Sequence, residues 1–142
     1  MIESSAFYIS ALRKHFTTYC SDKLSKMGLT YGQLYIIIFV GKKQKCSPKD
    51  ISLALRLDLG QLNRTLSKLI ENNFVLQEKN EKDKRSNVIS LTKHGEDIFR
   101  ESYNLFHKWD KLVLDSLTDI EKQTFIELIR KVALSQYEKE KK

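Results

Sequence analysis

Residues 58–75 read DLGQLNRTLSKLIENNFV, and this stretch decides the fold prediction. Asp58 is a typical helix N-cap residue, and Gln61 stands three positions later, where the partner in a capping box is found. Apolar residues then recur at the three- and four-residue spacing of one helix face: Leu62, Leu66, Leu69 and Ile70. Asn72 and Asn73 tolerate the left-handed conformation that ends a helix. The stretch therefore predicts an amphipathic helix that leads into a strand.

A second, shorter helix is expected immediately before it. Ser47 is a good N-cap, Pro48 suits the first helical position, and Asp50 falls in the positively polarised first turn. Its buried side is expected to comprise Ile51, Ala54 and Leu55. A break at Arg56-Leu57 separates the two helices, which predicts two short helices joined by a tight turn.

A β-hairpin is expected after the second helix. Residues 74–76 and 88–91 are β-prone, and the polar, charged segment 77–87 lies between them. Helix, turn, helix and hairpin in this order make a winged helix-turn-helix.

Further helices flank this unit. Apolar spacing predicts helices over about 3–27, 30–42 and 92–115, and the capping box at 118–121 begins a final helix. The apolar run 34–40 would also suit a buried strand, but the Thr30 cap favours a helix. The fold class is therefore mainly α with a small β-hairpin.

Two regions are expected along the chain. Residues 29–115 form a DNA-binding winged helix-turn-helix with a long connecting helix. Residues 1–28 and 116–142 form a helical dimerisation region, because the apolar stripes on 9–27 and 120–137 are too long for a small domain to cover alone. The Lys-rich end from Glu138 is expected to fray.

Length and composition exclude several classes of protein. A chain of 142 residues with 41% hydrophobic and 30% charged residues suits one globular domain. The apolar run Tyr35–Val40 is far too short to span a membrane, and the N-terminus lacks a signal-peptide pattern, so a cytoplasmic protein without a membrane partner is expected. Two cysteines predict neither a disulfide framework nor a metal site.

Catalysis is not expected either. The three histidines, His15, His94 and His107, are scattered and stand in no catalytic or metal-ligand pattern, and no Gly-rich phosphate loop is present. The sequence predicts no cofactor.

Positive charge is concentrated in the middle of the chain. Residues 42–93 hold 12 Lys/Arg and 6 Asp/Glu, a net charge of +6, whereas the whole chain has +7. Clustered positive charge indicates a surface that binds a polyanion, and it coincides with the predicted winged helix-turn-helix.

The exposed face of the helix over 59–73 offers groups suited to double-stranded DNA. Gln and Asn can read adenine, Arg can read guanine, Lys and Ser suit phosphates, and Gly permits close approach of a backbone. The predicted contacts are Gly60, Gln61, Asn63, Arg64, Ser67 and Lys68.

The hairpin tip is a second candidate contact. Asp83, Lys84 and Arg85 lie at its centre, and a basic tip beside a helix-turn-helix can enter a minor groove, whose negative potential attracts Arg. Asp83 is two residues before Arg85 and is expected to brace its guanidinium.

At motif level the chain resembles the MarR family of bacterial transcription regulators. Residues 29–34 are similar to the family's Leu-Thr-x-x-Gln opening of the second helix, and residues 57–75 to its recognition-helix stretch. Residues 83–85 and 91–95 are similar to the wing signature Asp-x-Arg followed by Leu-Thr-x-x-Gly. There are departures: residues 60–63 stand where the family often has Ser-Thr-Val-Thr, Asn73 replaces a usual Gly, and Lys84 a frequent Arg. The first of these leaves the base preference open.

The resemblance implies a homodimer, joined by its first and last helices, that binds a palindromic operator and is regulated by a small molecule or by oxidation. We predict a repressor whose DNA affinity is modulated by a small aromatic or apolar effector. Residues that could line its pocket are Phe16, Tyr19, Cys20, Tyr31, Tyr35, Phe106 and Trp109, although core packing is the alternative for most of these aromatic rings. Two other functions stay open: a thiol switch at Cys20, and a winged helix used only as a protein-interaction adaptor. Cys46 is expected to be exposed.

Overall fold

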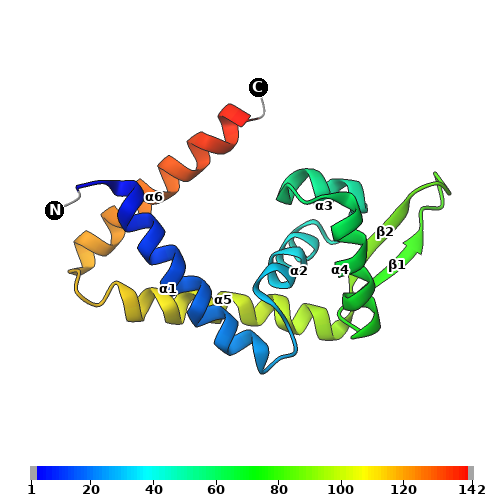
Figure 1. Ribbon diagram of the computed structural model, residues 1–142, viewed down its shortest axis with the longest axis horizontal. Helices are drawn as coiled ribbons and strands as arrows, with labels where there is room; N and C mark the ends of the chain where they lie inside the picture. Colours follow the sequence, from blue (N-terminus) through cyan, green and yellow to red (C-terminus); the bar gives the residue numbers. More distant parts are fainter. Residues whose placement is uncertain (1–2, 141–142) are drawn as a thin grey trace. The chain divides into compact units, whose positions relative to one another are not determined.

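The computed structural model describes residues 3–140. Within these residues the chain forms six helices and a two-stranded antiparallel sheet (Figure 1): α1 (Ser5–Ser25), α2 (Tyr31–Lys43), α3 (Pro48–Leu55), α4 (Leu59–Glu71), β1 (Val75–Lys79), β2 (Asn87–Leu91), α5 (Lys93–Val113) and α6 (Asp119–Glu140). The predicted order of elements and the predicted fold class are confirmed. None of these helices is long and apolar enough to cross a membrane.

The starts of α2, α3, α4 and α6 are fixed by hydrogen bonds within a few residues. Reciprocal capping boxes begin α2 at Thr30 and Gln33, α3 at Ser47 and Asp50, and α6 at Thr118 and Glu121. Asp58 begins α4 by accepting a 3.1 Å hydrogen bond from the Gln61 backbone N–H. These bonds satisfy amide groups that have no partner inside the helix, so the chain must turn where they form.

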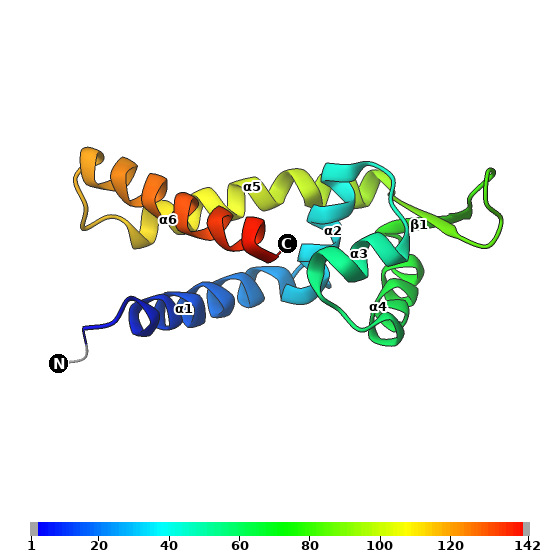
Figure 2. The same cartoon turned by 90° about the horizontal axis from the view of Figure 1, so that it is seen from above.

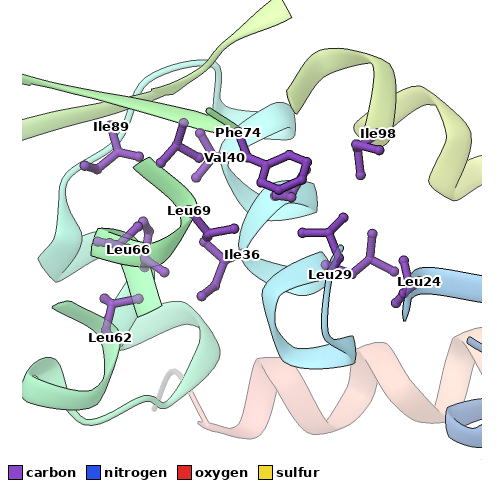
Figure 3. Packing of buried hydrophobic residues seen from close by; sticks show 14 of the residues in the cluster. Leu24, Leu29, Ile36, Val40, Leu62, Leu66, Leu69, Phe74, Ile89 and Ile98 are labelled. Carbon is purple, nitrogen blue, oxygen red and sulfur yellow. The ribbon is translucent and has the colours of Figure 1, made fainter. Parts of the chain in front are cut away.

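The core of the winged helix-turn-helix lies between α2 and α4. Leu62, Leu66 and Leu69 of α4 belong to the same buried cluster as Ile36 and Val40 of α2 (Figure 3). The apolar run 34–40 is therefore a buried helix, and its alternative as a strand is wrong.

Two residues predicted on buried faces are exposed. Ala54 of α3 and Ile70 of α4 lie at the edges of their apolar faces, and the neighbouring elements cover only the centre of each face. Ile51 is completely buried and Leu55 is half-buried, so the face predicted for α3 is narrower than expected.

The hairpin pairs Val75 with Leu91 and Lys79 with Asn87, so both strands are five residues long. Cys46 adds a one-residue bridge to β2: its N–H donates to Ile89 O over 3.1 Å and its carbonyl accepts from Ile89 N–H over 2.7 Å. Cys46 is buried as a result, so the expectation that it is exposed is wrong.

Thr92 joins the hairpin to α5. Its hydroxyl oxygen lies 2.7 Å from Asn73 O and 3.1 Å from Phe74 O, and it accepts a 2.9 Å bond from Gly95 N–H. The Phe74 carbonyl also accepts from the Thr92 N–H. A Cβ on Gly95 would lie 2.1 Å from Phe74 O, so only glycine fits there. The Leu-Thr-x-x-Gly motif thus holds the carbonyl edge of residues 73–74 against the first turn of α5.

The chain divides into two compact units, one ending at Phe106 and the other beginning at His107. The first unit contains α1–α4, the hairpin and most of α5. In the second unit, α6 carries large apolar side chains that are exposed within this single chain: Ile120, Ile126, Leu128, Ile129, Val132, Leu134 and Tyr137. The helix continues to Glu140, so the fraying expected from Glu138 is not seen in residues 138–140. Residues 1–2 and 141–142 of the predicted dimerisation region lie outside the described residues.

Candidate nucleic-acid interface

The polar face of α4 is solvent-exposed on the side opposite its leucines. Leu62, Leu66 and Leu69 are buried, each with at most 2% of its surface exposed. By contrast, every predicted contact residue on this helix is exposed: Gly60, Gln61, Asn63, Arg64, Ser67 and Lys68. The arrangement follows from helix geometry, because residues three and four apart share a face. Amide, guanidinium, hydroxyl and ammonium groups are therefore presented together from one helix.

Gly60 lies next to the guanidinium of Arg64. A Cβ built on Gly60 would be 3.8 Å from Arg64 Nη1 and 3.2 Å from Asp58 Oδ2. Arg64 therefore reaches back toward the N-terminal end of α4, where recognition helices in helix-turn-helix proteins contact base edges.

The wing tip is an ordered turn centred on Asp83. Its Oδ1 accepts from the Arg85 backbone N–H over 3.1 Å and from Arg85 Nε over 3.2 Å, while its carbonyl accepts from Ser86 N–H over 3.1 Å. The expected contact between Asp83 and Arg85 is present. The Arg85 side chain is nonetheless 92% exposed, and a guanidinium has five N–H donors, so this bond leaves donors for another partner. Lys84 is exposed beside it.

A recess of about 540 Å³ connects the start of α3, the start of α4 and the wing. Its lining residues come from all three elements: Ser47, Pro48, Lys49, Asp50, Leu59, Asn63, Asn80, Arg85, Ser86 and Asn87. Figure 2 shows α3 and α4 side by side, with β1 leading away from α4 into the hairpin. The recess brings together Asn63 and Arg85, two predicted contact residues that are 22 positions apart in the sequence.

Of the residues that line this recess, Asn63 and Arg85 were predicted as contacts, whereas the others were not: Ser47, Pro48, Lys49, Asp50, Leu59, Asn80, Ser86 and Asn87. Lys49 could have been identified from the sequence, because it is a cation at the start of a helix within the basic segment 42–93. Leu59 could not, since an apolar residue next to a helix cap is ordinarily assigned to the core.

Comparison with known proteins agrees with this geometry. A family model described as transcriptional regulator SarA/Rot matches residues 18–102. The chain belongs to the SarA/Rot family of transcriptional regulators. One curated relative, the HTH-type transcriptional regulator BilQ of Clostridium symbiosum, is 38% identical over 132 residues, which cover 93% of this chain and 92% of the relative. The HTH-type transcriptional regulator SarZ of Staphylococcus epidermidis is 34% identical over 92 residues, covering 65% of this chain and 61% of that protein.

Solved structures confirm the MarR-type fold of this SarA/Rot-family regulator. The reduced form of MarR from E. coli matches with a TM-score of 0.85 and 25% identity over 93% of this chain and 98% of that chain. A mutant E. coli MarR complexed with operator DNA matches with a TM-score of 0.75 and 24% identity, covering 89% and 91% of the two chains. The protein is a DNA-binding transcription regulator of the MarR and SarA type and not an enzyme.

The residues predicted to line an effector pocket are only partly brought together in this SarA/Rot-family regulator. Ring centroids of Phe16 and Phe106 are 5.4 Å apart, those of Phe16 and Tyr31 are 6.1 Å apart, and those of Tyr31 and Tyr35 are 4.9 Å apart. The Tyr31 and Tyr35 hydroxyls are 2.9 Å apart and share a hydrogen bond. Burial, together with this bond, raises the pKa of Tyr35. The four rings pack on one another in the first unit.

The remaining pocket candidates have separate environments. Tyr19 is half-buried, and Lys23 Nζ lies 5.7 Å from its ring centroid. Trp109 belongs to the second unit. Cys20 is completely buried, and burial raises the pKa of its thiol to about 11. A thiol with this pKa is protonated at neutral pH and is a poor nucleophile, which argues against the thiol switch.

Proposed function

We propose that this regulator acts as a homodimer on a palindromic operator, with α4 in the major groove of each half-site and the wing in the adjacent minor groove. The observation that carries the proposal is the recess, where Asn63 of α4 and Arg85 of the wing line one surface. A helix presenting amide and guanidinium groups can read base edges, while an arginine on a narrow hairpin suits a minor groove. Ser67, Lys68 and Lys84 supply contacts to phosphates.

Unburied apolar surface supports the dimer. Phe7, Tyr8 and Ile9 of α1 are each at least half exposed, and α6 carries a longer series of exposed apolar side chains. Surface of this kind on a single chain indicates an interface, and a two-fold dimer matches a two-fold DNA site. Residues 1–28 and 116–142 are therefore the proposed dimerisation region, and residues 29–115 the DNA-binding domain. Sedimentation at micromolar concentration is expected to give about 33 kDa, twice the chain mass of 16.6 kDa.

DNA docking is tested with a duplex selected by the wild-type protein from a random-sequence pool. Asn63→Ala and Arg64→Ala should each weaken binding to this duplex by about 1–3 kcal/mol. Lys68→Ala should weaken binding to all duplexes alike and should make the slope of log affinity against log salt concentration shallower by about one unit. Asn104→Ala is the matched control, since Asn104 is exposed on α5, outside the proposed DNA-binding face, and its amide donates to Glu101. Wild-type affinity in both Asn63→Ala and Arg64→Ala would rule out the assigned face.

We further propose that the regulator is a repressor and that a small aromatic or apolar effector lowers its operator affinity. The support is the half-buried aromatic group of Phe16, Tyr31, Tyr35 and Phe106, where the two tyrosine hydroxyls share a hydrogen bond and could anchor an effector beside the apolar rings. A reporter gene placed behind the selected duplex should be silenced by the regulator and released by the effector. Tyr35→Phe should alter the effector response and leave DNA binding without effector unchanged.

A further inference from the structure

Leu59 is an apolar side chain in an otherwise polar site. It is the first residue of α4 and is 47% exposed, whereas the other leucines of this helix are buried. Among the residues that line the recess, its neighbours are amides, hydroxyls and charged groups, with Pro48 the other apolar member. A single exposed leucine is ordinary on a protein surface, so its position rather than its exposure is informative.

The position of Leu59 is fixed relative to Asn63. The two residues are four apart on α4, so their Cβ atoms lie about 5–6 Å from each other on the same flank of the helix. Both line the recess together with Arg85. Leu59 is nearer the N-terminus of α4, the end from which recognition helices contact bases. A duplex that meets the Asn63 amide therefore also meets the Leu59 methyl groups.

We propose that Leu59 contacts the C5 methyl group of a thymine in each half-site, next to the base contacted by Asn63. The thymine methyl is the largest apolar group that a standard base pair presents in the major groove, because cytosine carries only a hydrogen at the same C5 position. Against any other base edge, Leu59 would cover donors or acceptors without pairing them, which is unfavourable. Leu59 therefore favours thymine in two ways: it contacts the thymine methyl group, and it leaves the polar edges of the other bases without hydrogen-bond partners. This inference rests on the proposed docking of α4.

The test removes the methyl group alone. In the duplex selected by the wild-type protein, each thymine is replaced by deoxyuridine, symmetrically in both half-sites, and affinity is measured by fluorescence anisotropy. Loss of one buried methyl contact should raise the dissociation constant about fourfold. Because the replacement is made in both half-sites, the duplex altered at the thymine that Leu59 contacts should bind about fifteenfold more weakly, and duplexes altered at other thymines should not. Leu59→Ala should weaken binding to the thymine duplex and show no further loss with deoxyuridine at that position.

Leu53→Ala is the matched control, because Leu53 is a 70% exposed leucine on α3 that is not among the recess-lining residues. It should retain the full deoxyuridine effect, and Leu59→Met should retain much of it. An undiminished deoxyuridine effect in Leu59→Ala would overturn the proposal. Insensitivity of the wild-type protein at every thymine would do the same without any variant. If the wild-type protein selects no duplex at all, the proposed docking of α4 fails together with the Leu59 contact. If it selects a duplex but shows no deoxyuridine effect, only the Leu59 contact fails.

Discussion

Replacing Gly95 with alanine is expected to lower the free energy of unfolding by about 3 kcal/mol. A Cβ at this position would lie 2.1 Å from the Phe74 carbonyl oxygen, and Cβ atoms in proteins essentially never come closer than 3.0 Å to a neighbour. Because the obstacle is backbone, relief requires the start of the hairpin and α5 to separate by about 1 Å.

The magnitude follows from the bonds that this separation breaks. The Phe74 carbonyl accepts from Thr92 N–H, and the Thr92 hydroxyl donates to the neighbouring Asn73 O over 2.7 Å. Two such bonds contribute about 1 kcal/mol each. The overcrowding itself costs about 2 kcal/mol, and the higher helix propensity of alanine returns about 1 kcal/mol.

Urea denaturation followed by far-UV circular dichroism measures the effect. Gly32→Ala is the matched control, because Gly32 is also in the first turn of a helix, and a Cβ there meets no atom within 4 Å. The control should equal or exceed wild-type stability. A Gly95→Ala protein with the wild-type midpoint and slope would refute the reasoning, since it would mean that the hairpin yields freely at this contact.

Three further outcomes are expected. Gly60→Ala should weaken DNA binding in anisotropy titrations, because the methyl group projects from the face proposed to approach DNA; the thermal melt should change little, because the higher helix propensity of alanine, about 1 kcal/mol, is offset by a 3.2 Å contact between the new Cβ and Asp58 Oδ2 at the N-cap of α4. Arg85→Ala should weaken binding most on duplexes with A·T-rich flanks, and Asp83→Ala should also weaken it if Asp83 orients Arg85; tighter binding of Asp83→Ala in the same titration would instead show that its charge merely repels phosphate. Burial raises the pKa of both Cys20 and Cys46 to about 11 from an ordinary value of 9.0, so native protein at neutral pH should react with iodoacetamide only as fast as it unfolds, and rapid alkylation of Cys20 would restore the thiol switch as a candidate. The free energy of unfolding should fall as pH rises from about 9 to about 11, because the thiols lose their protons more readily in the unfolded chain.

Helix starts were predictable because their determinants are local. Thr30 bonds to Gln33 and Ser47 to Asp50, so each capping box is complete within four residues of sequence. The exposed face of α4 was predictable for a related reason: once the buried leucines are known, helix geometry assigns the other side.

The environment of Cys46 was not predictable, because its burial depends on a bridge to Ile89, 43 residues later in the chain. Ala54 and Ile70 show a related limit. Periodicity identifies the centre of an apolar face, but the width that becomes covered depends on the neighbouring elements.

The recess was only half predictable. Asn63 and Arg85 could be identified separately from residue type and position, but Leu59 and Asn87 become part of the same site only through the way the hairpin lies beside α4. A leucine next to a helix cap gives no indication in sequence that it faces outward.

The bridge between Cys46 and Ile89 holds the base of the wing independently of its tip. β2 is bonded on one edge to β1 and on the other to the segment that leads into α3, while the tip closes on itself through the bond from Asn80 N–H to Ser86 O. Its base is thus anchored to the core independently of the tip. Changes of length or charge confined to residues 81–85 should therefore leave the base of the hairpin in place, so the reach of the wing proposed for the minor groove can change while α4, the proposed major-groove reader, keeps its position.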